Sequence, residues 1–227
     1  MTEAPFRVLF IIYPNMTQLD FTGPHQFLTR LPNSVTTIAS PAGGDVKADG
    51  LVFAQTVPVA QVAGCDLVCL PGGAGATEVS QDQDFLAELR RLAAGSRYVT
   101  SVCTGALILG AAGLLRGKRA TTHWAWQDLL PLFGAIPVAE RVVRDGNLIT
   151  GGGVTAGIDF ALTVMAEIAG DEAAQMVQLG FEYAPAPPFD SGTPETAPAE
   201  ILRRYQVVQR RMAPKRRAEA EAAAARL

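Results

Sequence analysis

The chain has 227 residues, of which 48% are hydrophobic and 18% are charged. This is the ordinary composition of a globular protein, and the length suits one sizeable α/β domain. The formal net charge of −3 provides no basic field that would attract nucleic acid. No apolar run reaches the roughly 18 residues that a membrane-spanning helix needs. Residues 1–6 lack the pattern of a signal peptide, so we expect a cytoplasmic protein.

Apolar runs alternate with helical patterns over the first half of the chain. The runs are rich in β-forming residues, and we expect strands at Phe6–Tyr13, Ser34–Ser40, Asp66–Leu70 and Tyr98–Val102. We expect helices at Asp84–Ala94 and at Gly105–Leu115, the second being apolar on all sides like a buried helix. This alternation predicts an open, mostly parallel sheet that is covered by helices on both faces.

The second half begins with a hairpin signal and ends in a helical tail. Asp145-Gly146 lies between two alternating runs, which favours a hairpin. After three glycines, Gly151–Gly153, we expect helices from about Thr155 to Ala169 and from Asp171 to Tyr183. A Pro-rich segment follows, and the stretch Ile201–Leu227 is helical by composition with an interruption at Pro214. We therefore place one domain at residues 1–188 and a linker with a helical tail at residues 189–227.

The tail contains a run of basic residues. Seven Lys or Arg residues and no acidic ones lie between Arg203 and Arg217. Such a run fits either an anion-binding patch or a solvated helix surface. Because most charge runs are solvated, we interpret this one as a solvated helix end.

The strongest chemical signal is a cysteine between a predicted strand and a predicted helix. Cys103 follows the strand that ends at Val102, and Gly105 begins the helix. This strand–turn–helix elbow places a thiol at the carboxyl edge of the sheet, where open α/β sheets bind their ligands. A helix N-terminus also favours a thiolate. We therefore predict that Cys103 is a nucleophile. Cys65 and Cys69 flank a core strand and are interpreted as small hydrophobic residues.

Two further segments are expected at the same edge of the sheet. The Pro71-Gly72-Gly73 loop follows a strand, and the N–H groups of Gly73 and Thr104 could together stabilise developing negative charge. A flexible turn fits the glycines equally well. Asp20 lies after the first strand, where it could either cap a helix that begins near Thr22 or take part in proton transfer.

Several motifs together give the chain a family resemblance. PGG, SVCTG followed by LILGAAGLLRGKRATTHW, and DGNLITGGGVTAGIDFAL resemble the ThiJ/PfpI superfamily over roughly residues 6–183. The resemblance implies a flavodoxin-like, three-layer sandwich of the glutamine amidotransferase-like type with a cysteine elbow. Within the superfamily, LDFTGP, CTG, ATTHWA and EYAPAPPF look most like the isonitrile hydratases. That likeness implies hydration of an isonitrile to an N-substituted formamide by a homodimer without a cofactor.

The resemblance also implies roles for single residues. Isonitrile hydratases carry an aspartate at the position of Asp20, so this residue is expected to be catalytic together with Cys103. Thr104 and Gly73 are expected to bind the substrate or its developing charge. His123 lies where some relatives place a histidine near the thiol, and it fits a pocket-lining residue as well as a structural histidine beside Trp124.

Two other functions share these motifs. A glyoxalase or deglycase acting on α-oxoaldehydes uses the same cysteine, usually with a glutamate and a histidine. Thr104, which stands where PfpI-type proteases have histidine, and Asp20 argue against that chemistry. A non-catalytic sensor related to AraC-type regulators is the second alternative, although the 44 residues after Tyr183 are too few for the added DNA-binding domain of about 100 residues seen in those proteins.

Overall fold

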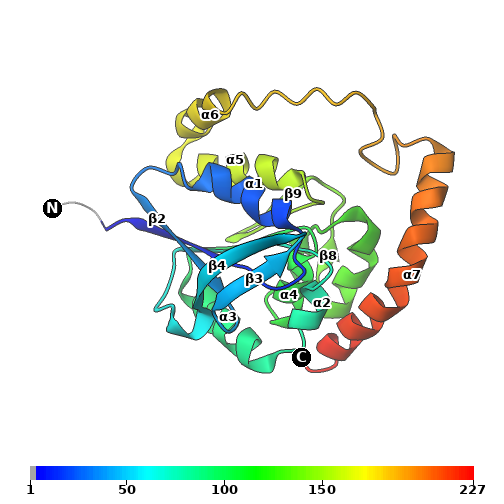
Figure 1. The fold of residues 1–227 in the computed structure, drawn as a ribbon, viewed down its shortest axis with the longest axis horizontal. Coiled ribbons are helices and arrows are strands. Elements are labelled where there is room, and N and C mark those ends of the chain that lie inside the picture. The colour runs from blue at the N-terminus through cyan, green and yellow to red at the C-terminus, as the bar shows by residue number, and fades with distance from the viewer. Residues whose placement is uncertain (1–3) are drawn as a thin grey trace.

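An eight-stranded sheet forms the centre of the protein, of which the computed structural model describes residues 4–227 (Figure 1). The strand order is β3-β4-β2-β1-β5-β6-β10-β9. The six strands from β4 to β10 in this order pair in parallel, whereas β9 and β3 are antiparallel edge strands. Their bounds are β1 Phe6–Ile11, β2 Ser34–Ser40, β3 Gly44–Ala48, β4 Leu51–Pro58, β5 Leu67–Leu70, β6 Tyr98–Val102, β9 Val142–Asp145 and β10 Leu148–Gly151. The parallel order β2-β1-β5-β6-β10 is flavodoxin-like and confirms the predicted fold class.

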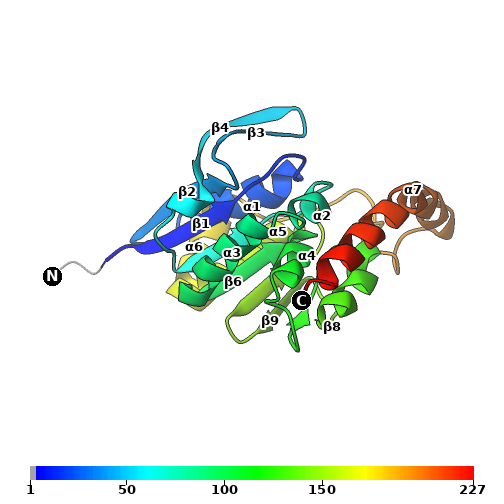
Figure 2. The same ribbon diagram turned by 90° about the horizontal axis from the view of Figure 1, so that it is seen from below.

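Helices cover both faces of this sheet (Figure 2). On one face α1 (Gln18–Leu28) and α5 (Ala156–Ala169) pack against each other and α6 (Asp171–Gly180) packs on α5. The other face carries α3 (Gln83–Gly95) and α4 (Gly105–Ala111), with α2 (Ala76–Val79) and the 3-10 segment η2 (Trp124–Phe133) beside α4. A one-turn segment η1 (Val59–Gln61) and a two-stranded sheet of β7 (Arg119–Ala120) and β8 (Ile136–Pro137) complete the domain.

The buried core reflects the apolar runs of the sequence. Every residue of β5, β6 and β10 is buried, as expected for strands covered on both faces. The predicted hairpin is present, with β9 and β10 joined around Gly146 at φ 64°. The helix predicted at Gly105–Leu115 ends earlier, at Ala111, because the chain turns at Gly113 with φ 76°.

The C-terminal tail differs from its prediction. A single helix, α7, runs from Ala199 to Ala224 and includes Pro214, so the predicted interruption is wrong. Its second half packs on α2, α4 and η2, with Ala220 and Ala223 buried, and this tertiary packing offsets the backbone hydrogen bond that proline cannot make. Figure 1 shows α7 along one end of the domain, reached from α6 by a long extended segment. Within residues 4–227 no helix has the length and apolarity to cross a bilayer.

Candidate active site

Cys103 occupies a strained turn between β6 and α4. Its φ is 55°, a conformation that costs a residue other than glycine on the order of 1–3 kcal/mol. Three backbone contacts hold the turn in place. The Cys103 N–H is shared between the carbonyl oxygens of Gly151 (3.0 Å) and Gly152 (2.9 Å), and the Cys103 carbonyl accepts from Thr122 Oγ1 at 2.8 Å. The glycine run Gly151–Gly153 therefore packs against the elbow.

The turn also needs a glycine at position 105, directly after Cys103 and Thr104. A Cβ atom at Gly105 would lie 2.2 Å from the Leu70 carbonyl oxygen, so no larger residue fits between the elbow and β5. Cys103 itself is only 5% exposed. The elbow thus places the sulfur at the carboxyl edge of the sheet in a nearly dry environment.

Asp20 reaches the sulfur from α1. The helix begins at Gln18 with Thr17 as N-cap, so Asp20 lies in the first turn and does not cap a helix that begins near Thr22. The side chain is fully buried, and Oδ2 accepts the Gly72 N–H at 3.0 Å. Oδ1 has no hydrogen bond of standard geometry within the described chain, and the thiol of Cys103 interacts with this carboxyl. The structure therefore brings the two predicted catalytic side chains together.

Burial decides the protonation of this pair. Loss of solvation raises the pKa of Asp20 to about 7, against the opposing interactions with the Cys103 thiol and the Gly72 N–H. Burial also raises the pKa of Cys103, and the Asp20 carboxyl raises it further. The Thr104 N–H at the start of α4 lowers this pKa, as the sequence predicted for a helix N-terminus, but burial and the Asp20 carboxyl outweigh it. The short α4 does not compensate for burial beside a carboxyl, so Cys103 rests as a thiol.

Two backbone N–H groups point to the sulfur and lower its pKa. They belong to Thr104 and Val154. Of the predicted pair of donors, Thr104 faces the sulfur and Gly73 does not. The Gly73 N–H donates to Thr104 Oγ1 at 2.9 Å, and that hydroxyl also bonds the Gly73 carbonyl at 3.1 Å. Gly73 therefore holds Thr104 instead of facing the sulfur, and the second donor is Val154, which the sequence analysis missed although it follows Gly151–Gly153.

His123 borders a cavity of about 490 Å³ beside the elbow. The cavity is lined by the segments 121–124, 139–141, 152–156 and 192–195. His123 is also the N-cap of η2, where Nδ1 accepts the Ala125 N–H at 3.2 Å and the ring stacks on Trp124. Burial lowers the pKa of His123 and favours the neutral ring. Its position combines the two predicted alternatives, a structural histidine that also lines the pocket.

Two further side chains near the sulfur have no signal in the sequence. Tyr13 is buried after β1, donates its hydroxyl to the Pro71 carbonyl at 2.7 Å, and has its pKa raised by burial and then by Asp20 and Cys103. Arg216 of α7 is 6% exposed and belongs to the basic run that we interpreted as solvated. For Arg216 this interpretation is wrong, because α7 folds back onto the domain.

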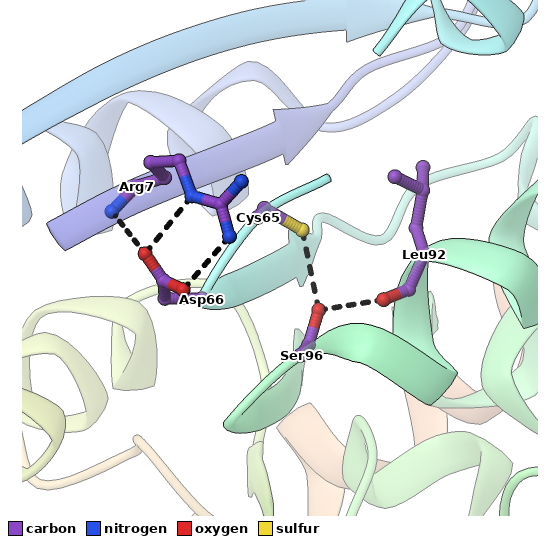
Figure 3. A network of polar contacts seen from close by, with 5 residues as sticks. All are labelled: Arg7, Cys65, Asp66, Leu92 and Ser96. Carbon is purple, nitrogen blue, oxygen red and sulfur yellow. Dashed lines mark hydrogen bonds and ion pairs between the residues drawn. The ribbon is translucent and has the colours of Figure 1, made fainter. Parts of the chain in front are cut away.

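The other two cysteines lie away from the elbow, among core residues. Cys65 precedes β5 at the amino end of the sheet, and its sulfur lies 3.2 Å from Ser96 Oγ, beside the ion pair of Arg7 and Asp66 (Figure 3). Cys69 is fully buried within β5, and burial raises the pKa of its thiol to about 12. Both are positioned as structural residues.

Comparison with known proteins places this geometry in a family. The DJ-1/PfpI family model matches residues 6–167. An isonitrile hydratase of Pseudomonas putida is 53% identical over 86% of both chains, and protein dj-1beta of Drosophila melanogaster is 30% identical over 78% of this chain and 96% of its own. The crystal structure of a ThiJ/PfpI family protein from Pseudomonas syringae superposes with a TM-score of 0.90 at 38% identity, covering 97% of this chain and 91% of that one. The chain is therefore a member of the DJ-1/PfpI family.

Proposed function

We propose that this protein is an isonitrile hydratase that converts R–N≡C and water into the N-substituted formamide, with Cys103 as the nucleophile. The observation that carries the proposal is the fully buried Asp20 carboxyl beside the Cys103 thiol. The 53% identity to the Pseudomonas putida isonitrile hydratase supports the substrate class. A thiol and a carboxyl together are the groups that this hydration needs, because the isonitrile carbon must accept both a nucleophile and a proton.

In the first step the Cys103 sulfur bonds to the isonitrile carbon. Since the resting cysteine is a thiol, the ionised form of Asp20 takes the proton from the sulfur as the C–S bond forms. Asp20 then delivers this proton to the same carbon, and the product is the thioimidate R–N=CH–S–Cys103. With a pKa of about 7, Asp20 can both accept and release a proton near neutral pH. The N–H groups of Thr104 and Val154 stabilise negative charge on the sulfur.

In the second step water replaces the sulfur. Asp20, now ionised, removes a proton from a water molecule that attacks the thioimidate carbon, and the nitrogen is protonated. Collapse of the tetrahedral intermediate breaks the C–S bond, releases R–NH–CHO and returns the proton to Cys103. The cavity bordered by His123, Val154 and the segment 192–195 is the space that would accept the R group.

The decisive experiment is turnover of a simple aliphatic isonitrile by the reduced protein and by Cys103→Ala. We expect formamide production to vanish in C103A, while Cys65→Ala, which removes a sulfur from the amino end of the sheet, keeps it. Cys65 is a matched control because it is also a nearly buried free cysteine. If the reduced protein gives no formamide but consumes methylglyoxal, the α-oxoaldehyde alternative replaces this proposal. Turnover of neither compound would favour the sensor.

We also propose a cytoplasmic homodimer. All three cysteines are unpaired, as is usual in a reducing compartment. Apolar side chains are exposed along α7, namely Ile201, Tyr205, Val208 and Met212, at spacings of three and four residues that put them on one face of the helix. A continuous exposed apolar face of this kind suits a subunit interface.

A further inference from the structure

The second half of α7 is fixed to the domain by specific contacts. Thr77 Oγ1 of α2 donates to Glu219 Oε2 at 2.5 Å, and Gln81 Nε2 donates to the Glu219 carbonyl at 3.0 Å. Arg217 forms an ion pair with Asp128 of η2. Because α2 and η2 follow the active-site loops, these contacts hold this part of the C-terminal helix at the carboxyl edge of the sheet.

Arg216 points from α7 into this edge. Its guanidinium lies 4.3 Å from the centre of the Trp126 ring, a cation–π arrangement. Nη2 donates to the Gly73 carbonyl at 3.2 Å, and the residue is only 6% exposed. Stacking and hydrogen bonding together fix the plane of the guanidinium, as lysine could not do.

The charged and titratable groups around the guanidinium are mostly those of the active site. Cys103, Tyr13, Glu219 and Tyr205 are the acidic groups that act on it, and His123 is the basic one. Within residues 4–227 no carboxylate oxygen lies within ion-pair distance of Arg216. A buried cation without a paired carboxylate is costly. Its charge favours the ionised forms of these acidic groups, and the Cys103 thiol is one of them.

The hydrogen bond of Arg216 also reaches the sulfur through two residues. The Gly73 carbonyl accepts from both Arg216 and Thr104 Oγ1, and the Gly73 N–H donates back to Thr104 Oγ1. The Thr104 N–H in turn faces the Cys103 sulfur. Arg216 is therefore attached to the loop that sets the position of one of the two donors on the nucleophile.

From this geometry we propose that Arg216 of the C-terminal helix is a positioning residue of the active site, which fixes the Gly73–Thr104 loop and favours negative charge on the Cys103 sulfur. The inference rests on the proposed function in that Cys103 is taken as the nucleophile. It extends the site to the end of the chain, outside the residues 6–167 that match the family model.

The test measures the reactivity of the thiol without any isonitrile. The rate constant for alkylation of Cys103 by iodoacetamide is followed from about pH 6 to pH 10, because only the thiolate reacts. Mass spectrometry identifies the modified cysteine, and C103A provides the blank. We expect Arg216→Gln to slow alkylation about tenfold at a given pH, which corresponds to about one unit in the pKa of the thiol. Arg211→Gln, the same change at an exposed residue of α7, should leave the profile unchanged.

The following results would overturn the proposal or call for a second variant. An R216Q profile that matches that of the unaltered protein, or a shift of equal size in R211Q, overturns the proposal. If circular dichroism shows that R216Q is unfolded, Arg216→Lys takes its place. This variant keeps the charge, so alkylation should stay within about threefold, but loses the planar group, so kcat should fall about tenfold with KM unchanged. A kcat equal to that of the unaltered protein would overturn the positioning role. Because alkylation requires no substrate, failure of the hydratase proposal would remain distinguishable.

Discussion

The side chain of Asp20 is buried, so its negative charge is costly, and it lies beside Cys103, where its proton can be used in catalysis. The carboxyl is fully buried beside Cys103, and its pKa of about 7 lets it exchange a proton with the sulfur and the substrate. Asp20→Asn keeps an oxygen that can accept the Gly72 N–H but cannot transfer a proton. We expect kcat to fall by roughly 100- to 10,000-fold, the usual contribution of general acid–base catalysis, in steady-state assays of formamide production. Near-normal turnover by D20N would contradict the assigned role.

The same substitution should stabilise the protein. The pKa of Asp20 is about 7 in the folded protein and near its ordinary value of 3.8 when unfolded. As the pH rises between these values the unfolded chain loses the proton and the folded chain keeps it, so the free energy of unfolding falls. D20N avoids this loss. Its melting temperature at about pH 8 should exceed that of the unaltered protein by about 5 to 15 °C, corresponding to roughly 2 to 4 kcal/mol.

The pH dependence provides the control for this measurement. Below the ordinary pKa of aspartate the carboxyl is protonated in both the folded and the unfolded chain, so the advantage of D20N should shrink as the pH approaches about 4. A stability difference that stays constant between about pH 4 and pH 8 would show that the substitution acts through packing. The raised pKa of Asp20 would then not explain the effect.

In the loop after β5, the backbone of Gly72 lies so close to the elbow that no side chain fits at this position. A Cβ atom at Gly72 would lie 2.4 Å from the Thr104 nitrogen and 2.8 Å from Asp20 Oδ2. Gly72→Ala should therefore displace two site residues at once, cost about 1–3 kcal/mol of stability and lower kcat/KM at least about tenfold. Chemical denaturation and formamide assays measure the two effects.

Gly95, the last residue of α3, is the matched control. An added Cβ would meet nothing within 4 Å there, and alanine is the better helix former. Gly95→Ala should leave activity unchanged and stability equal or slightly higher. If G72A behaved like G95A, the close approach of the Gly72 loop to Asp20 and Thr104 would not be needed for function.

Strands and helices with strong local signals were predictable from the sequence. The ranges Ser34–Ser40 and Tyr98–Val102 agree with β2 and β6, and the hairpin around Gly146 is present. The β3–β4 hairpin was missed although Asp49-Gly50 provides the same signal, with both residues at positive φ. Its flanking strands are mostly exposed, and the single apolar run, Leu51–Ala54, is short.

The contacts that complete the site depend on the fold of the whole molecule. The sequence predicted that Asp20 and Cys103 lie at the same edge of the sheet, because both follow parallel strands, whereas only the family resemblance predicted that the two side chains meet. The Val154 N–H and Arg216 follow from how α5 and α7 dock, which no local pattern encodes. A basic residue in an otherwise solvated run has the same sequence signature whether it is exposed or buried. Arg216 differs from the other basic residues of the run in being buried, and this follows from the packing of the second half of α7 on the domain.

The first half of α7 leads to a prediction about assembly. If its apolar face joins two copies, the particle mass by light scattering should be twice the 24.0 kDa of one chain. Val208→Glu places a charge within this face and should shift the protein toward the monomer, because burying an unpaired carboxylate opposes association. Val207→Glu is the matched control, since Val207 is similarly exposed but points away from the Ile201–Met212 face of the helix. A monomeric unaltered protein, or equal dissociation by both variants, would exclude this face as the interface.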